Sequence, residues 1–306
     1  MQNRRDFLKT SAKLLGSAGI LSSALPHLLF AKNEAVAMPV PSIKLNNGVQ
    51  MPLLGLGTYS INDVATFIEA IKIGYRLIDS AQMYGNEKVV GESIKEATKT
   101  LGINREEFFI TTKLSENMDA QATKKSIDST LKLMGLEYLD LLLIHQPFEN
   151  AKAMYQAMEQ AYKDGKIKAI GVSNFTPDIY KDFITSCEIP PAINQCETHI
   201  FYQQQELRKV MQPYGTILES WSPFIKGQSG FFENPTLLKI AKAHNKSIAQ
   251  IALRFLLQEQ IIVIPKASKP QHMQENFNIF DFKLTKADMQ AIRKLDKNKG
   301  QFPYSR

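Results

Sequence analysis

The hydrophobic positions of this chain switch between two spacings along its length. From Leu53 onward, short and nearly continuous apolar runs recur eight times, at 53–58, 75–80, 108–114, 139–145, 169–174, 192–199, 216–222 and 261–266. Between these runs, apolar residues recur every three or four positions, as in Val90, Ile94, Ala97 and Leu101. That second spacing places apolar side chains on one face of a helix. The pattern therefore predicts eight strands that alternate with helices.

Strands that alternate with helices pair in parallel through right-handed crossovers, and eight such units close into a barrel. The alternative, a doubly wound sheet, needs a G-x-G-x-x-G loop after its first strand, and residues 55–60 lack the third glycine. Ahead of the first run, Asn47-Gly48 lies between alternating segments in 42–51, which is typical of a hairpin. We therefore expect an α/β fold, a (β/α)8 TIM barrel preceded by an N-terminal β-hairpin.

Composition narrows the class of protein. A chain of 306 residues with 44% hydrophobic and 22% charged residues can bury one large core. Beyond the N-terminal stretch, no apolar run approaches the ~20 residues that span a bilayer, which excludes a membrane transporter. The net charge of +7 includes no basic block, so an anionic small ligand is favoured over a nucleic acid. Cys187 and Cys196 lack metal-binding spacing, and we expect no metal site.

The first residues resemble a twin-arginine export signal. Arg4-Arg5 precedes Phe7-Leu8-Lys9, residues 14–31 carry no Asp, Glu, Lys or Arg, and Ala35-Val36-Ala37 matches a small-x-small cleavage pattern. Glycines, serines and a proline make the stretch a poor bilayer span, so stable membrane insertion is not expected. We predict a signal segment at 1–37, one barrel domain at 38–306, the export machinery as a partner and a periplasmic or exported location. The alternative is a simple tail on a cytoplasmic protein.

Polar residues follow three neighbouring predicted strands, at the barrel end where chemistry is placed in this fold. Asp79 lies near the end of the second run, with Tyr84 in the loop after it. Lys113 lies near the end of the third run, and His145 ends the fourth. Each alone has a structural interpretation, such as a cap or a buried histidine. Together they allow a phenol to give its proton to a developing alkoxide beside a lysine cation that the carboxylate holds, while the imidazole orients a carbonyl oxygen. Such a positioned acid contributes a rate factor on the order of 10² to 10⁴.

Several stretches make this chain resemble the aldo-keto reductases over about residues 42–295. The matching segments lie at or beside the predicted strands, at 51–58, 74–79, 84–87, 111–113, 165–168, 171–175, 194–195 and 264–266. The resemblance implies NAD(P)H-dependent reduction of an aldehyde or ketone to an alcohol by hydride transfer. In that scheme Tyr84 is the general acid, and Asp79, Lys113 and His145 are its partners.

The same resemblance implies a binding site for NADPH. Ser173, Asn174 and Gln195 would bind the nicotinamide carboxamide, and Trp221, followed by Ser222, would stack on the ring. The residues expected at the adenosine end are Lys266, His272, Glu275 and Asn276, with Lys266 facing a 2′-phosphate. Position 272 is a histidine, where the family commonly has an arginine whose guanidinium group donates two hydrogen bonds to a phosphate. NADH therefore remains an alternative cofactor.

The resemblance also bears on the substrate. The short tail after Lys297 is similar to that of prokaryotic members, Gln146 replaces a tryptophan common after the catalytic histidine, and Ile200 replaces a proline. We expect an open pocket for a small carbonyl substrate in a monomer. Two other functions stay open: a non-catalytic NADP-binding protein on the same fold, and a Schiff-base lyase that uses Lys113. Asp79 would keep that lysine charged, which disfavours the lyase.

Overall fold

The computed structural model describes residues 40–303. The predicted export signal at 1–37 lies outside the described residues, so the signal and the domain boundary stay predictions. Within 40–303, no helix is both long and apolar enough to cross a membrane.

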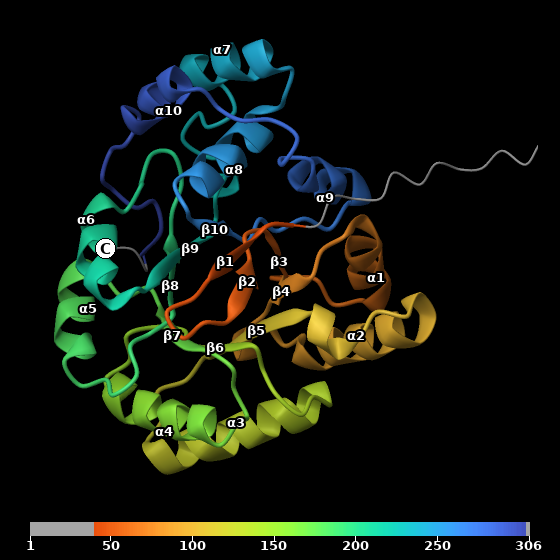
Figure 1. Cartoon of the computed structure of the whole chain (residues 1–306), viewed down its shortest axis with the longest axis vertical. Coiled ribbons are helices and arrows are strands. Elements are labelled where there is room, and N and C mark those ends of the chain that lie inside the picture. The colour runs from red at the N-terminus through yellow and green to blue at the C-terminus, as the bar shows by residue number, and fades with distance from the viewer. Residues whose placement is uncertain (1–39, 304–306) are drawn as a thin grey trace, which may run out of the picture. The chain divides into compact units, whose positions relative to one another are not determined.

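Eight parallel strands form one sheet in which each strand pairs with its neighbours in sequence (Figure 1). The strands are β3 (Gly55–Gly57), β4 (Leu77–Asp79), β5 (Phe109–Leu114), β6 (Leu141–Ile144), β7 (Ile170–Ser173), β8 (Ile193–Glu197), β9 (Ile217–Trp221) and β10 (Ile262–Val263). Parallel bridges from Leu54 to Val263 and from Gly57 to Lys266 join the last strand to the first. Each of the eight predicted runs contains one of these strands, so the predicted barrel is confirmed.

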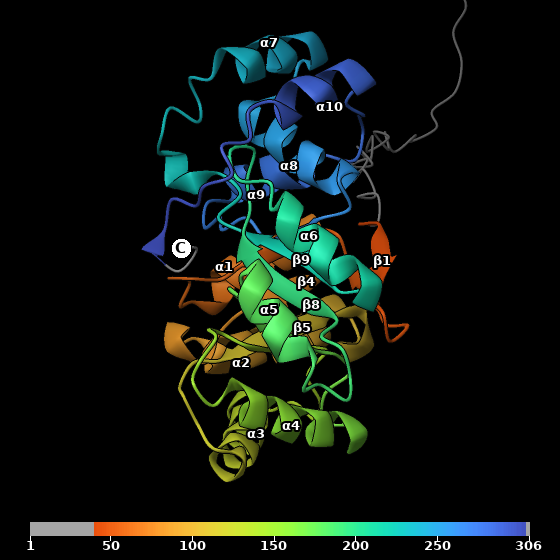
Figure 2. The same ribbon diagram turned by 90° about the vertical axis from the view of Figure 1, so that its left-hand side faces the viewer.

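Helices lie outside the strands, as the two views show (Figures 1 and 2). They are α1 (Val64–Ile73), α2 (Glu87–Leu101), α3 (Ala120–Met134), α4 (Ala151–Lys163), α5 (Pro177–Ile184), α6 (Gln205–Met211), α7 (Pro235–His244), α8 (Ile248–Gln258), α9 (Pro270–Phe277) and α10 (Lys286–Arg293). The predicted helical face of α2 is correct, because Val90, Ile94 and Ala97 are buried. Polar caps fix several starts; Ser247, for example, accepts a hydrogen bond from the Gln250 amide at the start of α8.

The predicted hairpin covers the end of the barrel at which the strands begin. Strands β1 (Ser42–Lys44) and β2 (Gln50–Pro52) pair antiparallel, and Gly48 takes a φ of 92° in a loop that is longer than the tight turn typical of Asn-Gly. The Asn46 side chain donates to Pro191 O at 3.1 Å, and Asn47 donates to Lys168 O at 2.8 Å. Both acceptors precede strands, so the opposite end of the barrel remains for a ligand.

Two buried clusters follow from the alternation of side chains along each strand. Leu141 and Leu143 point into the barrel with Leu77 and Ile193, and the hairpin residue Met51 joins them. The intervening residues of the strands pack outward against the helices in a larger cluster. Because every second strand residue faces inward, a polar residue two positions beyond an interior apolar residue enters the barrel at the end where the strands finish.

Candidate functional site

A buried ion pair lies inside the barrel at the ends of β4 and β5. Asp79 follows interior Leu77 by two positions, and Lys113 likewise lies on the inward face of β5. Lys113 Nζ donates to Asp79 Oδ1 at 2.6 Å and to Ser80 O at 2.7 Å. Burial alone would lower the pKa of Lys113, but the Asp79 charge and hydrogen bond raise it above its usual value. The lysine therefore stays cationic at neutral pH.

Asp79 is held from two sides. Burial raises the pKa of its carboxyl group, while the Lys113 charge and hydrogen bonds from Lys113 and Gln195 limit that rise. Gln195 Nε2 reaches Asp79 Oδ2 at 2.8 Å. With three hydrogen-bonding contacts fixing the pair, Asp79 is the counter-charge of Lys113.

Tyr84 lies above this pair in a short 3-10 turn, η1 (Gln82–Tyr84), which Gly85 ends with a φ of 68°. Ser115 fixes the turn by accepting a hydrogen bond from the Met83 amide at 3.1 Å. Lys113 Nζ is 5.2 Å from the centre of the Tyr84 ring. Burial raises the pKa of the Tyr84 hydroxyl above its ordinary value, and the Lys113 charge opposes this. The phenol therefore holds its proton at neutral pH.

His145 faces the tyrosine from the end of β6. The centres of the two rings are 6.0 Å apart, and His145 Nδ1 lies 3.1 Å from Ser115 Oγ. Burial, with the nearby Lys113 charge, lowers the pKa of His145 to about 3. The imidazole is therefore neutral and can donate from one ring nitrogen only.

Hydrogen bonds connect the residues predicted for a nicotinamide ring to Asp79 and His145. Asn174 donates to the His145 carbonyl oxygen at 3.0 Å and accepts from Trp221 Nε1 at 2.9 Å. Ser173 Oγ donates to the Gln195 carbonyl oxygen at 2.7 Å. Both hydrogens of the Gln195 amide nitrogen are used, by Asp79 Oδ2 and by Glu219 Oε2, each at 2.8 Å. Gln195 can therefore offer a ligand only its side-chain oxygen.

Ser222 gives an independent sign of a ligand at this end of the barrel. Its Oγ atom is buried and has no hydrogen-bond partner among residues 40–303. The residue also has a φ of 54°, in the left-handed region that is uncommon for serine. A buried hydroxyl without a partner is costly, and a phosphate or carboxamide oxygen would supply the missing acceptor.

The residues predicted for an adenosine end lie in the segment after β10 and along helix α9. Lys266 follows β10, and its bridge to Gly57 places its backbone at the same end of the barrel as the buried charges. Lys266 and His272 are exposed, Glu275 is half-buried and Asn276 is buried. Lys266 Nζ has a weak contact with Ser268 Oγ at 3.4 Å. The structure thus leaves its charge accessible to an anion.

Sequence reasoning missed two residues of this site. Ser115 contacts both the Tyr84 turn and His145, but it is one of many loop serines. Glu219 is fully buried beside Gln195. Its signal was present in the sequence, because a carboxylate in the middle of an apolar run of strand length needs a reason.

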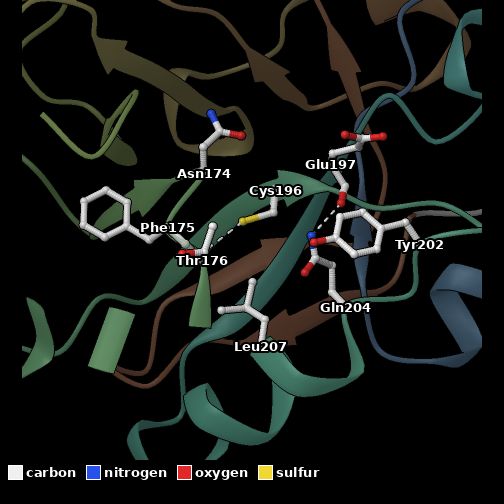
Figure 3. A pocket seen from close by; sticks show the side chains of 8 residues that line it. All are labelled: Asn174, Phe175, Thr176, Cys196, Glu197, Tyr202, Gln204 and Leu207. Atoms are coloured by element: carbon white, nitrogen blue, oxygen red, sulfur yellow. Dashed lines mark hydrogen bonds between the residues drawn. The ribbon is translucent and has the colours of Figure 1, made fainter. Parts of the chain in front are cut away.

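A small cavity lies beside this region, outside the barrel, between the ends of β7 and β8 and helix α6 (Figure 3). Its volume is about 10 Å³, which is room for about one water molecule and not for a substrate. Figure 3 shows the Cys196 thiol directed at the Phe175 backbone, and the thiol also lies 3.2 Å from Asn194 Oδ1. Burial raises the pKa of the Cys196 thiol to about 12, so it remains a neutral thiol. Within 40–303, no cluster of His, Cys, Asp and Glu could hold a metal ion.

Comparison with known proteins gives concordant matches. The model of the Aldo/keto reductase family matches residues 54–297. A glyoxal reductase of Bacillus subtilis is 43% identical over 263 residues, covering 84% of this chain and 93% of its own length. An aldo-keto reductase from a Medee basin deep-sea metagenome library is 40% identical with a TM-score of 0.81, covering 85% of this chain and 97% of its own. A Bombyx mori aldo-keto reductase in complex with NADP is 33% identical with a TM-score of 0.80, covering 86% and 95%.

Proposed function

The chain belongs to the aldo/keto reductase family, and from that premise we propose that it reduces an aldehyde or ketone to an alcohol, with NADPH as the hydride donor and Tyr84 as the general acid. One observation carries the assignment of the acid: the protonated phenol of Tyr84 lies beside the buried Lys113–Asp79 pair and the neutral imidazole of His145. Phenol, cation and imidazole converge where a carbonyl oxygen would become an alkoxide.

Each residue has a defined task in this proposal. Tyr84 Oη gives its proton to the alkoxide oxygen, and Lys113 stabilises the tyrosinate that remains. Asp79 keeps Lys113 charged and in place. In the tautomer in which His145 Nδ1 accepts from the Ser115 hydroxyl, Nε2–H donates to the substrate oxygen and polarises the carbonyl. Preorganised donors of this kind cost no reorganisation when charge develops.

The cofactor proposal rests on donors and acceptors of the chain that fit a nicotinamide dinucleotide. NADPH supplies the hydride when bound. The Gln195 side-chain oxygen and Asn174 would hold the carboxamide, Ser173 would support them, and Trp221 would cover one face of the ring. The unpartnered Ser222 hydroxyl fits a cofactor oxygen. The NADP complex of the Bombyx relative supports this proposal.

At the other end of the cofactor, we assign Lys266, His272, Glu275 and Asn276 to the adenosine moiety. Lys266 would pair with a 2′-phosphate, while His272 lacks the fork that an arginine would offer. We therefore propose NADPH as the preferred cofactor and NADH as a weaker one.

A small carbonyl compound is the proposed substrate. The glyoxal reductase relative supports this class. Gln146 is half-buried after His145, where it occupies less space than a tryptophan. We further propose that the protein is a monomer. From the sequence of residues 1–37 we propose that it reaches the periplasm through the twin-arginine machinery and is not stably inserted in a membrane.

Turnover by the purified full-length protein tests the function directly. NADPH and NADH absorbance is followed with a panel of aldehydes, ketones and sugars, with Tyr84→Phe as the matched control. Substrate-dependent oxidation that is lost in the control supports the reductase. Cofactor binding without oxidation would favour the non-catalytic nucleotide-binding protein. Borohydride trapping of a substrate on Lys113 would favour the lyase, which the charged state of Lys113 opposes.

A further inference from the structure

Glu219 is a second carboxyl group inside the barrel, and the proposed chemistry assigns it no task. It lies on β9 opposite Gln195 of β8, and its side chain is fully buried. The Gln195 amide nitrogen donates to Glu219 Oε2 and to Asp79 Oδ2, both at 2.8 Å. One amide thus connects carboxyl groups from β4 and β9 across the interior of the barrel.

The groups around Glu219 supply one positive charge for two carboxyl groups. Lys113 Nζ is committed to Asp79 and Ser80, and Glu219 Oε1 has no hydrogen-bond partner among the described residues. A buried anionic oxygen without a donor is far more costly than a neutral acid. Burial and the Asp79 charge accordingly raise the pKa of Glu219 to about 8. The contact with Lys113 favours Asp79 as the anion of the two, and Glu219 as the neutral acid.

We propose that Glu219 is a positioning residue: as a neutral acid it keeps the Gln195 nitrogen turned toward the carboxyl groups and the Gln195 oxygen toward the ligand, and it leaves Lys113 with Asp79 as its single counter-charge. The part that concerns turnover rests on the proposed reductase function. A reversed Gln195 amide would place its oxygen against Glu219 and Asp79, so the two acceptors fix its orientation.

Ionisation of Glu219 would limit the reductase in alkaline solution. The titratable groups that face Glu219 are Asp79 from β4 and Lys113 from β5, and Tyr84 lies beyond Lys113. The neighbouring strand β8 contributes the uncharged Gln195. Strands β9 and β10 contribute no other titratable group. A second negative charge beside Lys113 offsets the field that helps Tyr84 to release its proton. Tyr84 then becomes a weaker proton donor, and carbonyl reduction slows.

The proton donor, its lysine cation and the imidazole titrate outside this range. The pKa values of Tyr84 and Lys113 are raised above their ordinary values, which are already roughly 10. The pKa of His145 is lowered to about 3. A loss of reduction that begins near pH 8 therefore distinguishes Glu219 from Tyr84, Lys113 and His145.

Glu219→Gln is the matched test, because glutamine keeps an oxygen acceptor for Gln195 and cannot ionise. If the ionised form is inactive, the turnover number of the wild-type protein falls about tenfold between pH 7 and pH 9. In E219Q we expect the turnover number to stay constant between pH 7 and pH 9. Glu87→Gln is the control, since Glu87 is another buried carboxyl group, bonded to Thr112 outside the site, and should keep the wild-type decline. The same decline with pH in E219Q overturns the proposal, and so does a loss of E219Q turnover at pH 7.

Infrared spectroscopy tests the protonated acid without any turnover. The wild-type minus E219Q difference spectrum at pH 7 should contain the carbonyl stretch of a protonated carboxylic acid, and that band should disappear as the pH passes 8. Absence of the band at pH 7 overturns the proposal, whatever the kinetics show. If no carbonyl compound is reduced while the band is present, the proposed function fails and the protonated state of Glu219 stands.

Discussion

Among single residues, Tyr84 has the most specific expected effect, because Tyr84→Phe removes one hydroxyl and keeps the ring contacts with Tyr59 and His145. We expect the turnover number to fall on the order of 10² to 10⁴-fold, which is the usual contribution of a positioned acid. NADPH affinity should stay unchanged. Trp221 is the only tryptophan of the chain, so its fluorescence reports cofactor binding separately from turnover. Retained turnover would remove Tyr84 from its assigned role.

The Lys113–Asp79 pair carries a stability prediction as well as a catalytic one. Both side chains are at most 2% exposed, so Asp79→Asn leaves a lysine in the interior without its counter-charge. Breaking a buried pair in this way costs about 3 to 5 kcal/mol of folding free energy. Urea unfolding at neutral pH, monitored by circular dichroism, measures the loss. A variant as stable as the wild type would mean that the pair is not needed to hold this end of the barrel.

At the scale of secondary-structure elements, the alternation along a strand explains how much of the site could be predicted. Asp79, Gln195 and Glu219 each follow an inward-facing apolar residue by two positions, namely Leu77, Ile193 and Ile217. The apolar runs predicted the strands, and the strand ends predicted the end of the barrel that holds the buried charges. Glu219 fits the same rule, but it lies in the middle of the 216–222 run and no motif of the resemblance includes it.

Other features of the site depend on pairings that no local pattern specifies. Gln195 contacts Asp79 from 116 residues away along the chain, and Ser115 contacts His145 from 30 residues away. Closure of the barrel creates the first contact, and the parallel pairing of β5 with β6 creates the second. The use of both Gln195 amide hydrogens by carboxyl groups, which leaves only its oxygen for a ligand, therefore required the structure.

Helix α9 carries a prediction about cofactor preference. His272 is exposed in its first turn, six residues along the chain from the exposed Lys266 that follows β10. His272→Arg replaces an imidazole by a permanently charged guanidinium group that can donate two parallel hydrogen bonds to a phosphate. We expect NADPH to bind about tenfold more tightly, because a hydrogen bond to a charged group contributes about 1.5 to 3 kcal/mol. NADH affinity should be unchanged. Trp221 fluorescence titrations with both cofactors give the comparison. An equal gain for both would place His272 away from the 2′-phosphate.

For the barrel as a whole, the two ends of the sheet have separate tasks. The hairpin is fastened where strands begin, while the buried charges gather where strands finish. The interior between them is filled by apolar side chains, with Leu77, Leu141 and Ile193 among the fully buried ones. A change confined to the hairpin therefore alters the stability of the fold without reaching Tyr84 or Lys113.

Replacing Asn46 and Asn47 together by alanine tests that separation. The double variant loses side-chain hydrogen bonds to the loops before β7, β8 and β9, with acceptors at Lys168, Pro191 and Tyr214. Because these bonds are partly exposed to solvent, we expect a total loss of about 1 to 3 kcal/mol in unfolding free energy. Turnover number and NADPH affinity, measured at a temperature where the variant remains folded, should match those of the wild type. A large loss of turnover with intact folding would mean that the hairpin controls the packing of the barrel interior as far as Asp79. The two ends of the barrel would then be structurally coupled.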